Sequence, residues 1–430
     1  MIKEVFESKS FAVVGASKEE HKVGHIIFKN LISNGINAIP INNNAKEILG
    51  KKCYKSLLEA PKVDCVIIAI PAEFVPQILK DMAKKALNNA IIISAGFLEA
   101  GNKILNEEIK KIALNNKINI MGPNSLGFMN PHNKVNATFS DIMPKAGDIA
   151  FISQSGAIGA AIFDKEINLS GFISIGNSLL VDFSYWIDYF SHDKNTKVIT
   201  LYIESIGENR GKKFIESCKK CTKPIIALKA GKSSLGNRAA SSHTAALASE
   251  EGVYEGIFKQ AGIIEVDSIR ELFDVANLYS KIKLSRKSAC IVTNAGGPGV
   301  LCSDYLNKYS INIPELPKKL SDKLSKMLPN GWSKNNPVDI LGDAKADLYL
   351  KTFKILEKEN FFDFFIVLLT PQYMTEPDKT ADAILKINKK PVIACFMGGK
   401  KVKPAIDKLK NKIPVFDELK DMAQGIGKVR

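Results

Sequence analysis

The chain has 430 residues, 45% of them hydrophobic and 24% charged, which is the composition of an ordinary globular protein with about three domains. It contains no uninterrupted run of 18 apolar residues and no apolar signal core at its start, so we expect no transmembrane span and a cytoplasmic protein. The net charge of +15 comes from lysines spread along the chain, and it fits a polyanionic small ligand or an acidic partner chain as well as nucleic acid.

Short β-branched runs, each followed by a glycine or serine turn and a helical segment, recur along the whole chain. They lie at 11–17, 37–42, 63–71, 90–97 and 118–125, then at 147–157, 171–177, 198–205 and 224–233, and finally at 289–299, 362–371 and 391–399. Apolar strands that alternate with helices predict parallel sheets covered by helices on both faces. We therefore predict an α/β protein of three doubly wound domains, 1–142, 143–284 and 285–430.

The cysteines indicate reduced thiols. The chain has seven, and several of them, such as Cys65, Cys290 and Cys395, lie inside apolar runs. Cys218 and Cys221 form a lone CxxC pair. Since no second pair accompanies it, we expect no metal site.

The first predicted domain has the features of a nucleotide site. In doubly wound sheets, ligands lie outside the carboxyl ends of the strands. Gly15, Ala16 and Ser17 end the first strand, and a helix is expected to begin near Val23–Gly24, so free N–H groups would face a phosphate. The spacing is not G-x-G-x-x-G, and the second strand ends in Asn42 where a dinucleotide site carries an acidic residue.

The sequence therefore favours a nucleotide-bearing ligand other than NAD in this domain. Its later strands end in three more turns, at Pro71, at 94–97 and at 122–128. The alternative is a Rossmann-like domain whose turns are purely structural.

Two loops further along have the composition of an anion site. The first consists of Ser153, Gln154, Ser155 and Gly156, and the second, in the third predicted domain, contains Thr293, Asn294, Gly296, Gly297 and Gly299. Hydroxyls and free N–H groups at a helix N-terminus attract an anion, and each helix end contributes about 0.3–2 kcal/mol. Two such loops aimed at one phosphate would hold it firmly.

Glu204 and His243 are the candidate catalytic residues. Glu204 ends a predicted strand, and His243 lies in the stretch RAASSHTAALAS, whose small residues leave room around the imidazole. A carboxylate that binds one ring nitrogen fixes the tautomer and leaves the other nitrogen as a nucleophile. The alternatives are a surface carboxylate and an ordinary helix start capped by Ser241 or Ser242.

The ordered set of motifs resembles the alpha subunit of the ADP-forming acyl-CoA synthetases (acetate–CoA ligase, ADP-forming) and, more distantly, succinyl-CoA synthetase. In chain order the motifs are VGAS with Lys22–Gly24, IPAEFVP, IIISAGF, GPNSLGF, VNATFS, ISQSGA, LYIES, LKAGKS, SSHTAALAS, TNAGGPGV and NPVDILGDA. They span nearly the whole chain. Each motif is weak alone, but the ordered set is highly specific.

The resemblance implies a Rossmann-like CoA-binding domain followed by two flavodoxin-like ligase domains. It implies a phosphohistidine at His243 with Glu204 as its supporting carboxylate. The phosphate would lie between the helices that begin at Ser153–Gly156 and in the Gly296–Gly299 loop. The positions that match the CoA site are Gly15, Ala16, Ser17, Lys22, Gly24, Pro71, Ala95, Gly96, Asn124 and Ser125.

The implied reaction converts acyl-CoA, ADP and phosphate to a carboxylate, CoA and ATP through an acyl phosphate and the phosphohistidine. Members of the family need an ATP-grasp module, and no stretch remains for one once three domains are assigned. The resemblance therefore implies an ATP-grasp beta subunit that supplies ADP or ATP with Mg, and a small carboxylic acid or acyl-CoA as substrate, without nucleic acid or membrane. The alternative is a non-catalytic CoA- or acyl-CoA-sensing module of the same fold.

The sequence departs from the family pattern at three places. Asn43–Asn44 stand where Pro-Lys commonly follows the second strand, and Ala245 and Ser249 replace glycines around the SHT motif. Leu180 stands where an acidic residue usually follows Gly176–Asn177. This last departure predicts a different acyl pocket.

Overall fold

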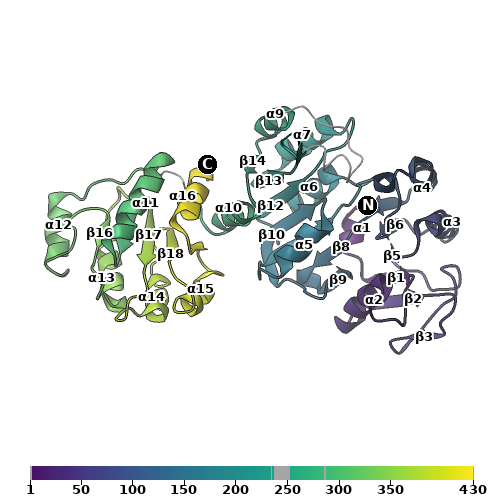
Figure 1. Cartoon of the computed structure of the whole chain (residues 1–430), viewed down its shortest axis with the longest axis horizontal. Helices are drawn as coiled ribbons and strands as arrows, with labels where there is room; N and C mark the ends of the chain where they lie inside the picture. Colours follow the sequence, from purple (N-terminus) through teal and green to yellow (C-terminus); the bar gives the residue numbers. More distant parts are fainter. Residues whose placement is uncertain (1, 234, 237–251, 285–286, 430) are drawn as a thin grey trace. The chain divides into compact units, whose positions relative to one another are not determined.

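The computed structural model describes residues 2–233, 235–236, 252–284 and 287–429, and it contains three large β-sheets in chain order (Figure 1). The chain divides into two compact units, an N-terminal unit, Met1–Asp267, with the first two sheets, and a C-terminal unit, Ser268–Arg430, with the third.

The first sheet is parallel, with the order β2-β1-β5-β6-β7. Its strands are β1 (Ser10–Val14), β2 (Asn37–Ile41), β5 (Cys65–Ile68), β6 (Asn89–Ile92) and β7 (Asn119–Met121). The elements around it are α1 (Ile2–Phe6), α2 (Val23–Ser33), the small hairpin β3 (Glu47–Ile48) and β4 (Lys51–Lys52), α3 (Val75–Lys84) and α4 (Lys103–Asn115). Alternate residues of β1 are buried on opposite faces, Val13 against Phe28 of α2 and Val14 in the cluster that contains Leu79 of α3.

The second sheet has the order β14-β13-β12-β10-β11-β8-β9. Its strands are β8 (Gly127–Asn130), β9 (Val135–Thr138), β10 (Ala146–Ser153), β11 (Leu169–Ser174), β12 (Val198–Ile203), β13 (Ile225–Lys229) and β14 (Ile264–Val266). Its helices are α5 (Gly156–Phe163), α6 (Phe183–His192), α7 (Gly211–Lys220) and α9 (Val253–Ala261).

The third sheet is again parallel, with the order β16-β15-β17-β18-β19. Its strands are β15 (Ala289–Thr293), β16 (Val338–Asp339), β17 (Phe364–Leu369), β18 (Val392–Phe396) and β19 (Val415–Phe416). Its helices are α10 (Ile269–Lys281), α11 (Gly296–Lys308), α12 (Lys318–Ser325), α13 (Ala346–Leu356), α14 (Pro377–Ile384), α15 (Lys403–Leu409) and α16 (Leu419–Lys428). Val292 is buried with the α12–α15 layer and Ile291 with α10, α11 and α16, so both faces of the sheet are covered.

All three sheets share one strand order. Counted in chain order within each sheet, the parallel strands lie in the order 2-1-3-4-5, as β2-β1-β5-β6-β7, β11-β10-β12-β13-β14 and β16-β15-β17-β18-β19. This is the flavodoxin-like order, in which ligands bind at the switch point between strands 1 and 3. Every predicted run contains a strand, and the three doubly wound layers are confirmed.

The antiparallel hairpin β8–β9 is absent from the predicted runs. It lies inside the predicted first domain, 1–142, yet β8 pairs with β11. Only the short 3-10 turn η3 (Pro131–Asn133) and Lys134 connect the two strands, and so short a link allows only antiparallel pairing. The edge strands β14, β16 and β19 are also absent from the predicted runs, because two or three residues are too few to show a periodicity.

The division into compact units falls at 267/268, whereas the sequence predicts boundaries at 142/143 and 284/285. Helix α10, which the sequence places in the second domain, packs against α16 of the C-terminal unit. The three-domain division stays a prediction. No helix among the described residues is long and apolar enough to cross a membrane.

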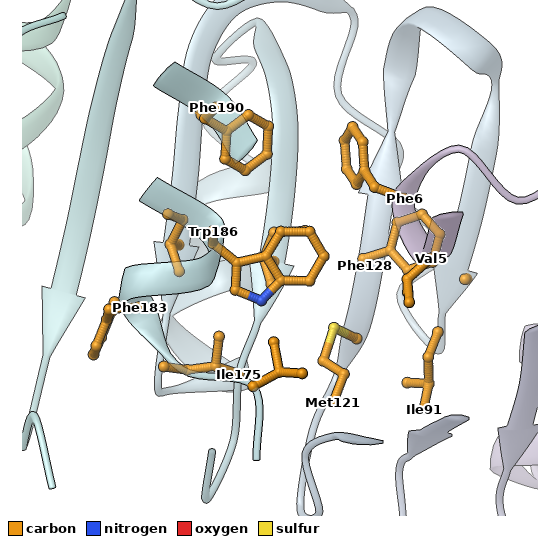
Figure 2. Packing of buried hydrophobic residues seen from close by; sticks show 14 of the residues in the cluster. Val5, Phe6, Ile91, Met121, Phe128, Ile175, Phe183, Trp186 and Phe190 are labelled. Carbon is orange, nitrogen blue, oxygen red and sulfur yellow. The ribbon is translucent and has the colours of Figure 1, made fainter. Parts of the chain in front are cut away.

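One hydrophobic core joins the first and second sheets. It contains Phe6 of α1, Met121 of β7, Phe128 of β8 and Trp186 of α6, all buried, and Figure 2 shows these side chains packed together. The ring centroid of Phe6 lies 5.5 Å from that of Phe128 and 6.2 Å from that of Trp186. Because the two sheets share this core, they form one compact unit.

In the C-terminal unit, one arginine meets three carboxylates. Arg270 of α10 forms ion pairs with Asp417 and with Asp421, the latter at 2.7 Å, and its Nε lies 3.7 Å from Asp274 Oδ2. Burial, together with the charges of Asp421 and Asp417, raises the pKa of Asp274 to about 7 although Arg270 opposes the shift. Asp274 therefore holds its proton to a higher pH than an ordinary aspartate does.

We predict that Phe6→Ala destabilises the N-terminal unit by about 3–5 kcal/mol, because it removes a buried aromatic ring from the core that the two sheets share. The chain has two tryptophans, Trp186 in the N-terminal unit and Trp332 in the C-terminal unit. Urea unfolding of a Trp332→Phe background, followed by Trp186 fluorescence, measures the change. Phe74→Ala, which truncates a ring that is 57% exposed, is the control and should leave the midpoint in place.

We predict that Asp274 makes the stability of the C-terminal unit fall as the pH rises. The pKa of this group is about 7 in the folded chain against an ordinary value of 3.8, so the folded state binds its proton more tightly. The resulting stabilisation is complete below pH about 4 and is lost as the pH rises through about 7. Asp274→Asn should remove this dependence between about pH 4 and about pH 7, whereas the exposed Asp322→Asn should retain it. The measurement is urea unfolding followed by Trp332 fluorescence in a Trp186→Phe background. Parallel pH profiles for wild type and Asp274→Asn would contradict the assignment.

Candidate functional site

The loop after β1 meets the start of α2 backbone to backbone. Gly15 has a φ of +92°, and a Cβ atom on Gly24 would overlap the carbonyl oxygen of Gly15. Only glycine fits at both positions, because one needs a left-handed conformation and the other a close approach. Helix α2 begins at Val23, where the sequence predicts a helix start, and such a helix N-terminus favours an anion. The N–H groups of Gly15 and Ala16, which the sequence expects to be free, donate to the carbonyl oxygens of Ile41 and Val13, at 3.1 Å and 3.4 Å.

Two side chains that the sequence does not assign to the site hold this loop in shape. The buried His25 places Nδ1 2.8 Å from the carbonyl oxygen of Ser17. Asn42, at the end of β2, donates from Nδ2 to the carbonyl oxygen of Ala16 at 2.8 Å. Asn42 therefore has a structural role at the position where a dinucleotide site would carry its acidic residue.

The other predicted CoA positions all follow strands of the first sheet at its carboxyl edge. Lys22 is exposed just before α2, Pro71 is exposed after β5, Ala95 and Gly96 follow β6, and Asn124 and Ser125 follow β7. Ser125 differs from the rest because it is buried. Its Oγ donates to the carbonyl oxygen of Ser174 at 2.6 Å and accepts from the N–H of Gly127 at 3.0 Å, so Ser125 connects the two sheets.

Glu99 is a site residue that the sequence does not predict. Its Oε1 accepts from the N–H of Gly96 at 2.6 Å and from that of Phe97 at 3.2 Å, and its Oε2 accepts from Nδ2 of Asn177. This carboxylate binds the N–H groups that the turn would otherwise offer to an anion. The signal in the sequence is its place three residues after Gly96, which is the spacing of a side chain that caps its own turn.

The two candidate phosphate loops have the same hydrogen-bonded turn. Ser153 Oγ donates to the carbonyl oxygen of Ser155 at 2.7 Å and accepts from its N–H at 3.1 Å. Thr293 Oγ1 forms the same two hydrogen bonds with Ala295, at 2.9 Å and 3.1 Å. The predicted similarity of these loops is therefore present in their backbone geometry.

Each loop is also tied to the neighbouring strand by a side-chain amide. Gln154 Oε1 accepts from the N–H groups of Glu204 and Ser205, at 2.6 Å and 2.8 Å, after β12. Asn294 is fully buried and exchanges hydrogen bonds with Thr370, after β17, at 2.9 Å each. Both amides span the switch point between strands 1 and 3, so they position the loops. The Nδ2 group of Asn294 already donates to Thr370 and Gln372 and has little capacity left for a phosphate, whereas the hydrogen bonds of Gln154 use only its oxygen.

The helices that follow the loops start differently. Ser155 caps α5 by accepting from the N–H of Ile158 at 3.4 Å, and Gly156 begins the helix. Helix α11 has no side-chain cap, and its first residues, Gly296 and Gly297, are exposed. A Cβ atom on Gly297 would meet nothing within 4 Å, so this helix start is the more accessible of the two.

A buried lysine lies beside Glu204 at the carboxyl edge of the second sheet. Lys229 ends β13, is 5% exposed, and pairs in register with Ile203, the residue before Glu204. Its Nζ lies 4.4 Å from the ring centroid of Tyr254. Burial lowers the pKa of Lys229, and the charge of Glu204 opposes that shift. The motif LKAGKS contains Lys229, but the sequence alone gives it no role because its partners lie on other elements.

His243 lies outside the described residues, so the proposed catalytic histidine is not placed by the structure. Within residues 2–233, 235–236, 252–284 and 287–429, no group of three or more His, Cys, Asp or Glu side chains could hold a metal ion.

Three family models match the chain in order. A CoA binding domain matches residues 9–131, a succinyl-CoA ligase like flavodoxin domain matches 146–279, and a ligase-CoA domain matches 289–419. These matches contain all the parallel strands of the three sheets, and strand β9 lies between the first two matches.

Curated relatives are similar over nearly the whole chain. The chain is 39% identical to the acetate–CoA ligase (ADP-forming) II subunit alpha of Pyrococcus furiosus, over 98% of this chain and 96% of the relative. It is 41% identical to the acetate–CoA ligase (ADP-forming) of Methanocaldococcus jannaschii, over 96% of this chain but 61% of the relative. The chain thus spans an alpha subunit of such a ligase and about three fifths of the longer relative.

Solved structures share the fold over the whole chain. The dinucleotide-forming acetyl-coenzyme A synthetase 1 of Ca. Korarchaeum cryptofilum, in complex with phosphate and ADP, has a TM-score of 0.93 at 33% identity and covers 100% of this chain and 96% of its own. A protein from Pyrococcus horikoshii OT3 has a TM-score of 0.89 at 35% identity, with 100% and 98% covered. With the sequence relatives, these structures show that the chain belongs to the family of ADP-forming acetate–CoA ligase alpha subunits.

Proposed function

We propose that the chain is the alpha subunit of an ADP-forming acyl-CoA synthetase, which converts acyl-CoA, ADP and phosphate to a carboxylate, CoA and ATP. The proposed division of labour follows the predicted domains. Residues 1–142 bind CoA, 143–284 carry the phosphohistidine, and 285–430 supply the second phosphate loop.

The observation that carries this proposal is the hydrogen bonding of Gln154 to the backbone of Glu204. Gln154 belongs to the candidate phosphate loop after β10, and Glu204 follows β12. These strands flank the switch point of the second sheet, where doubly wound proteins bind their ligands. The candidate phosphate loop and the candidate catalytic carboxylate therefore occupy one place in the fold.

The proposed chemistry has three balanced steps. A phosphate oxygen attacks the thioester carbonyl, the carbon–sulfur bond breaks, and CoA leaves as the thiol after taking up a proton. A ring nitrogen of His243 then attacks the phosphorus of the acyl phosphate, and the carboxylate leaves. Finally the phosphoryl group passes from His243 to ADP. Glu204 would accept the hydrogen bond of the other ring nitrogen and stabilise the positive charge that develops on the imidazole.

Lys229 supports this role of Glu204 in the proposed mechanism. A buried cation beside a carboxylate favours the ionised carboxylate, which is the form that accepts a hydrogen bond from an imidazole N–H. The N–H groups at the start of α5 would stabilise the negative charge of the phosphate, since preorganised donors act strongly where water is excluded.

We further propose a beta subunit with an ATP-grasp module, which would supply ADP or ATP together with Mg. Two of the Pyrococcus furiosus relatives are named as alpha subunits, and the chain covers 96% and 94% of their lengths.

The substrate is a small carboxylic acid or its acyl-CoA. All seven cysteines are free thiols, which fits a cytoplasmic location because cytosolic redox systems keep thiols reduced.

We predict that Glu204→Gln keeps the fold and CoA binding but slows turnover at least about 100-fold, the low end of the range for a lost catalytic group. Turnover is measured in the assembled enzyme with its nucleotide-binding subunit, and CoA binding by calorimetry on the chain. Glu216→Gln, which removes an exposed charge on α7, is the control and should turn over normally. Near-normal turnover of Glu204→Gln would make Glu204 an ordinary surface carboxylate.

We predict that labelled phosphate and an acyl-CoA together label the isolated chain at His243. The acyl phosphate and the phosphohistidine need only groups of this chain, whereas transfer to ADP needs the partner. The label should be acid-labile and base-stable, as expected for a nitrogen–phosphorus bond, and should be lost in His243→Asn while CoA binding survives. Adding the nucleotide-binding subunit and ADP should discharge it as ATP.

Two outcomes of the labelling experiment would contradict the proposal. Label that persists in His243→Asn would identify a different acceptor. If the wild-type chain takes up no label from several acyl-CoA substrates even with the partner present, the chain is a CoA- or acyl-CoA-sensing module instead of an enzyme subunit.

A further inference from the structure

A glutamate joins the turn after β6 to the loop after β11 in the N-terminal unit. Glu99, in the 3-10 turn η2 (Leu98–Ala100), accepts through Oε1 from the N–H groups of Gly96 and Phe97, at 2.6 Å and 3.2 Å, and through Oε2 from Nδ2 of Asn177. Its carboxylate therefore binds three N–H donors, two from the first predicted domain and one from the second. The mechanism proposed above gives Glu99 no role.

The carboxylate of Glu99 sets the orientation of the Asn177 amide. A carboxylate only accepts hydrogen bonds, so it selects the Nδ2 group of Asn177, and Oδ1 must point the other way. Nδ2 of Asn124, a predicted CoA position, lies 3.5 Å from that Oδ1 and donates to it. A neutral amide in place of the carboxylate could pair with either face of Asn177, and this fixed orientation would be lost.

The loops after β7 and β11 are also in direct backbone contact. The N–H groups of Asn177 and Leu179 donate to the carbonyl oxygens of Pro123 and Gly122, at 2.9 Å each. A Cβ atom on Gly176 would lie only 2.3 Å from the carbonyl oxygen of Pro123. Because the two loops meet without an intervening side chain, whatever fixes Asn177 also fixes the loop after β7.

Asn177 lies where these loops meet the candidate phosphate loop. Together with Gln154, it lines a cavity of about 750 Å³ between α4 and the loop that follows β12. Asn177 therefore borders both the predicted CoA positions and the loop at which the proposed reaction begins. Reaction between two bound groups requires their atoms to be held about 3–3.5 Å apart, and a misplacement of about 1 Å can slow the step about 100-fold.

We propose that Glu99 is a positioning residue for the first step of the proposed reaction, the attack of phosphate on the thioester. It acts through Asn177, whose orientation holds the CoA-binding loops at a fixed distance from the phosphate loop. The proposal rests on the proposed function, since it needs a thioester bound by the first predicted domain and a phosphate bound at Ser153–Gly156. Glu99 itself touches neither reactant.

Glu99→Gln tests the proposal, because the new amide oxygen can still accept from Gly96 and Phe97 while the amide nitrogen faces Nδ2 of Asn177, donor against donor. We expect the kcat of the assembled enzyme, with the acyl-CoA that wild type uses fastest, to fall at least about tenfold. The Kd of CoA, measured by calorimetry on the chain, should change less than about threefold. Exchange of label between ADP and ATP through His243 uses no CoA and should proceed as in wild type.

A second substitution provides a rescue. Asn177→Asp alone places two carboxylates together and should also lower kcat. Combined with Glu99→Gln, it restores the hydrogen bond with donor and acceptor exchanged, and kcat should return to within about threefold of wild type, a coupling expected only of groups in contact. Glu108→Gln, which neutralises an exposed carboxylate of α4, is the control and should turn over normally.

Four results would overturn the proposal in distinguishable ways. If wild type shows neither turnover nor ADP–ATP exchange, the proposed function fails and Glu99 has no step to position. If wild type is active and Glu99→Gln has a normal kcat, the proposed function stands and the positioning role is wrong. If the Kd of CoA rises as much as kcat falls, Glu99 serves CoA binding instead of the reaction step. If turnover and ADP–ATP exchange fall together and the double variant recovers neither, Glu99 only maintains the fold.

Discussion

The candidate site depends on the hydrophobic core that joins the first two sheets. Phe6 and Trp186 pack between the sheets and make one compact unit of them (Figure 2). The carboxyl edges of the two sheets are then fixed relative to each other. Hydrogen bonds from Ser125 to Ser174 and from Asn177 to Glu99 connect these edges. A cavity with walls from both layers can exist only because this packing is rigid, since loops on independently moving domains would not hold its shape.

The three sheets repeat one architecture, but the loop after the first strand differs in each. The first sheet has a glycine turn that meets the following helix backbone to backbone, and the other two have a hydroxyl turn at Ser153 or Thr293. In the second and third sheets an amide, Gln154 or Asn294, ties that loop to the residues after the third parallel strand. The strand order sets where a ligand binds, and the loop composition sets which group of the ligand it suits.

The sequence predicts the fold well because both of its signals are local. Buried strands show as apolar runs, and the turns that follow them show as glycine, serine and proline. The candidate loops are found in the same way, since Gly15, Ser153 and Gly297 lie within a few residues of a strand end.

The partners of those loops are less visible in the sequence. Glu99 contacts Asn177 across 78 positions, and Lys229 lies near Glu204 only because β12 and β13 are neighbours in the sheet. Ser125 and Asn294 have the residue types of ligand-binding positions, yet their hydrogen bonds are spent within the protein. Contacts of this kind depend on tertiary packing, which no local pattern encodes. His243 stays a prediction from the sequence.

The cysteines of the chain have a chemical consequence for a protein proposed to hold a thioester. Six of them are buried and Cys221 is half-buried, and burial raises the pKa of thiols such as Cys53 and Cys221. A protonated, inaccessible thiol is a poor nucleophile. The protein therefore resists acylating itself with its own substrate and resists mixed disulfides with its own product. For the same reason, thiol released during turnover can be titrated with a disulfide reagent while the native protein consumes little of it.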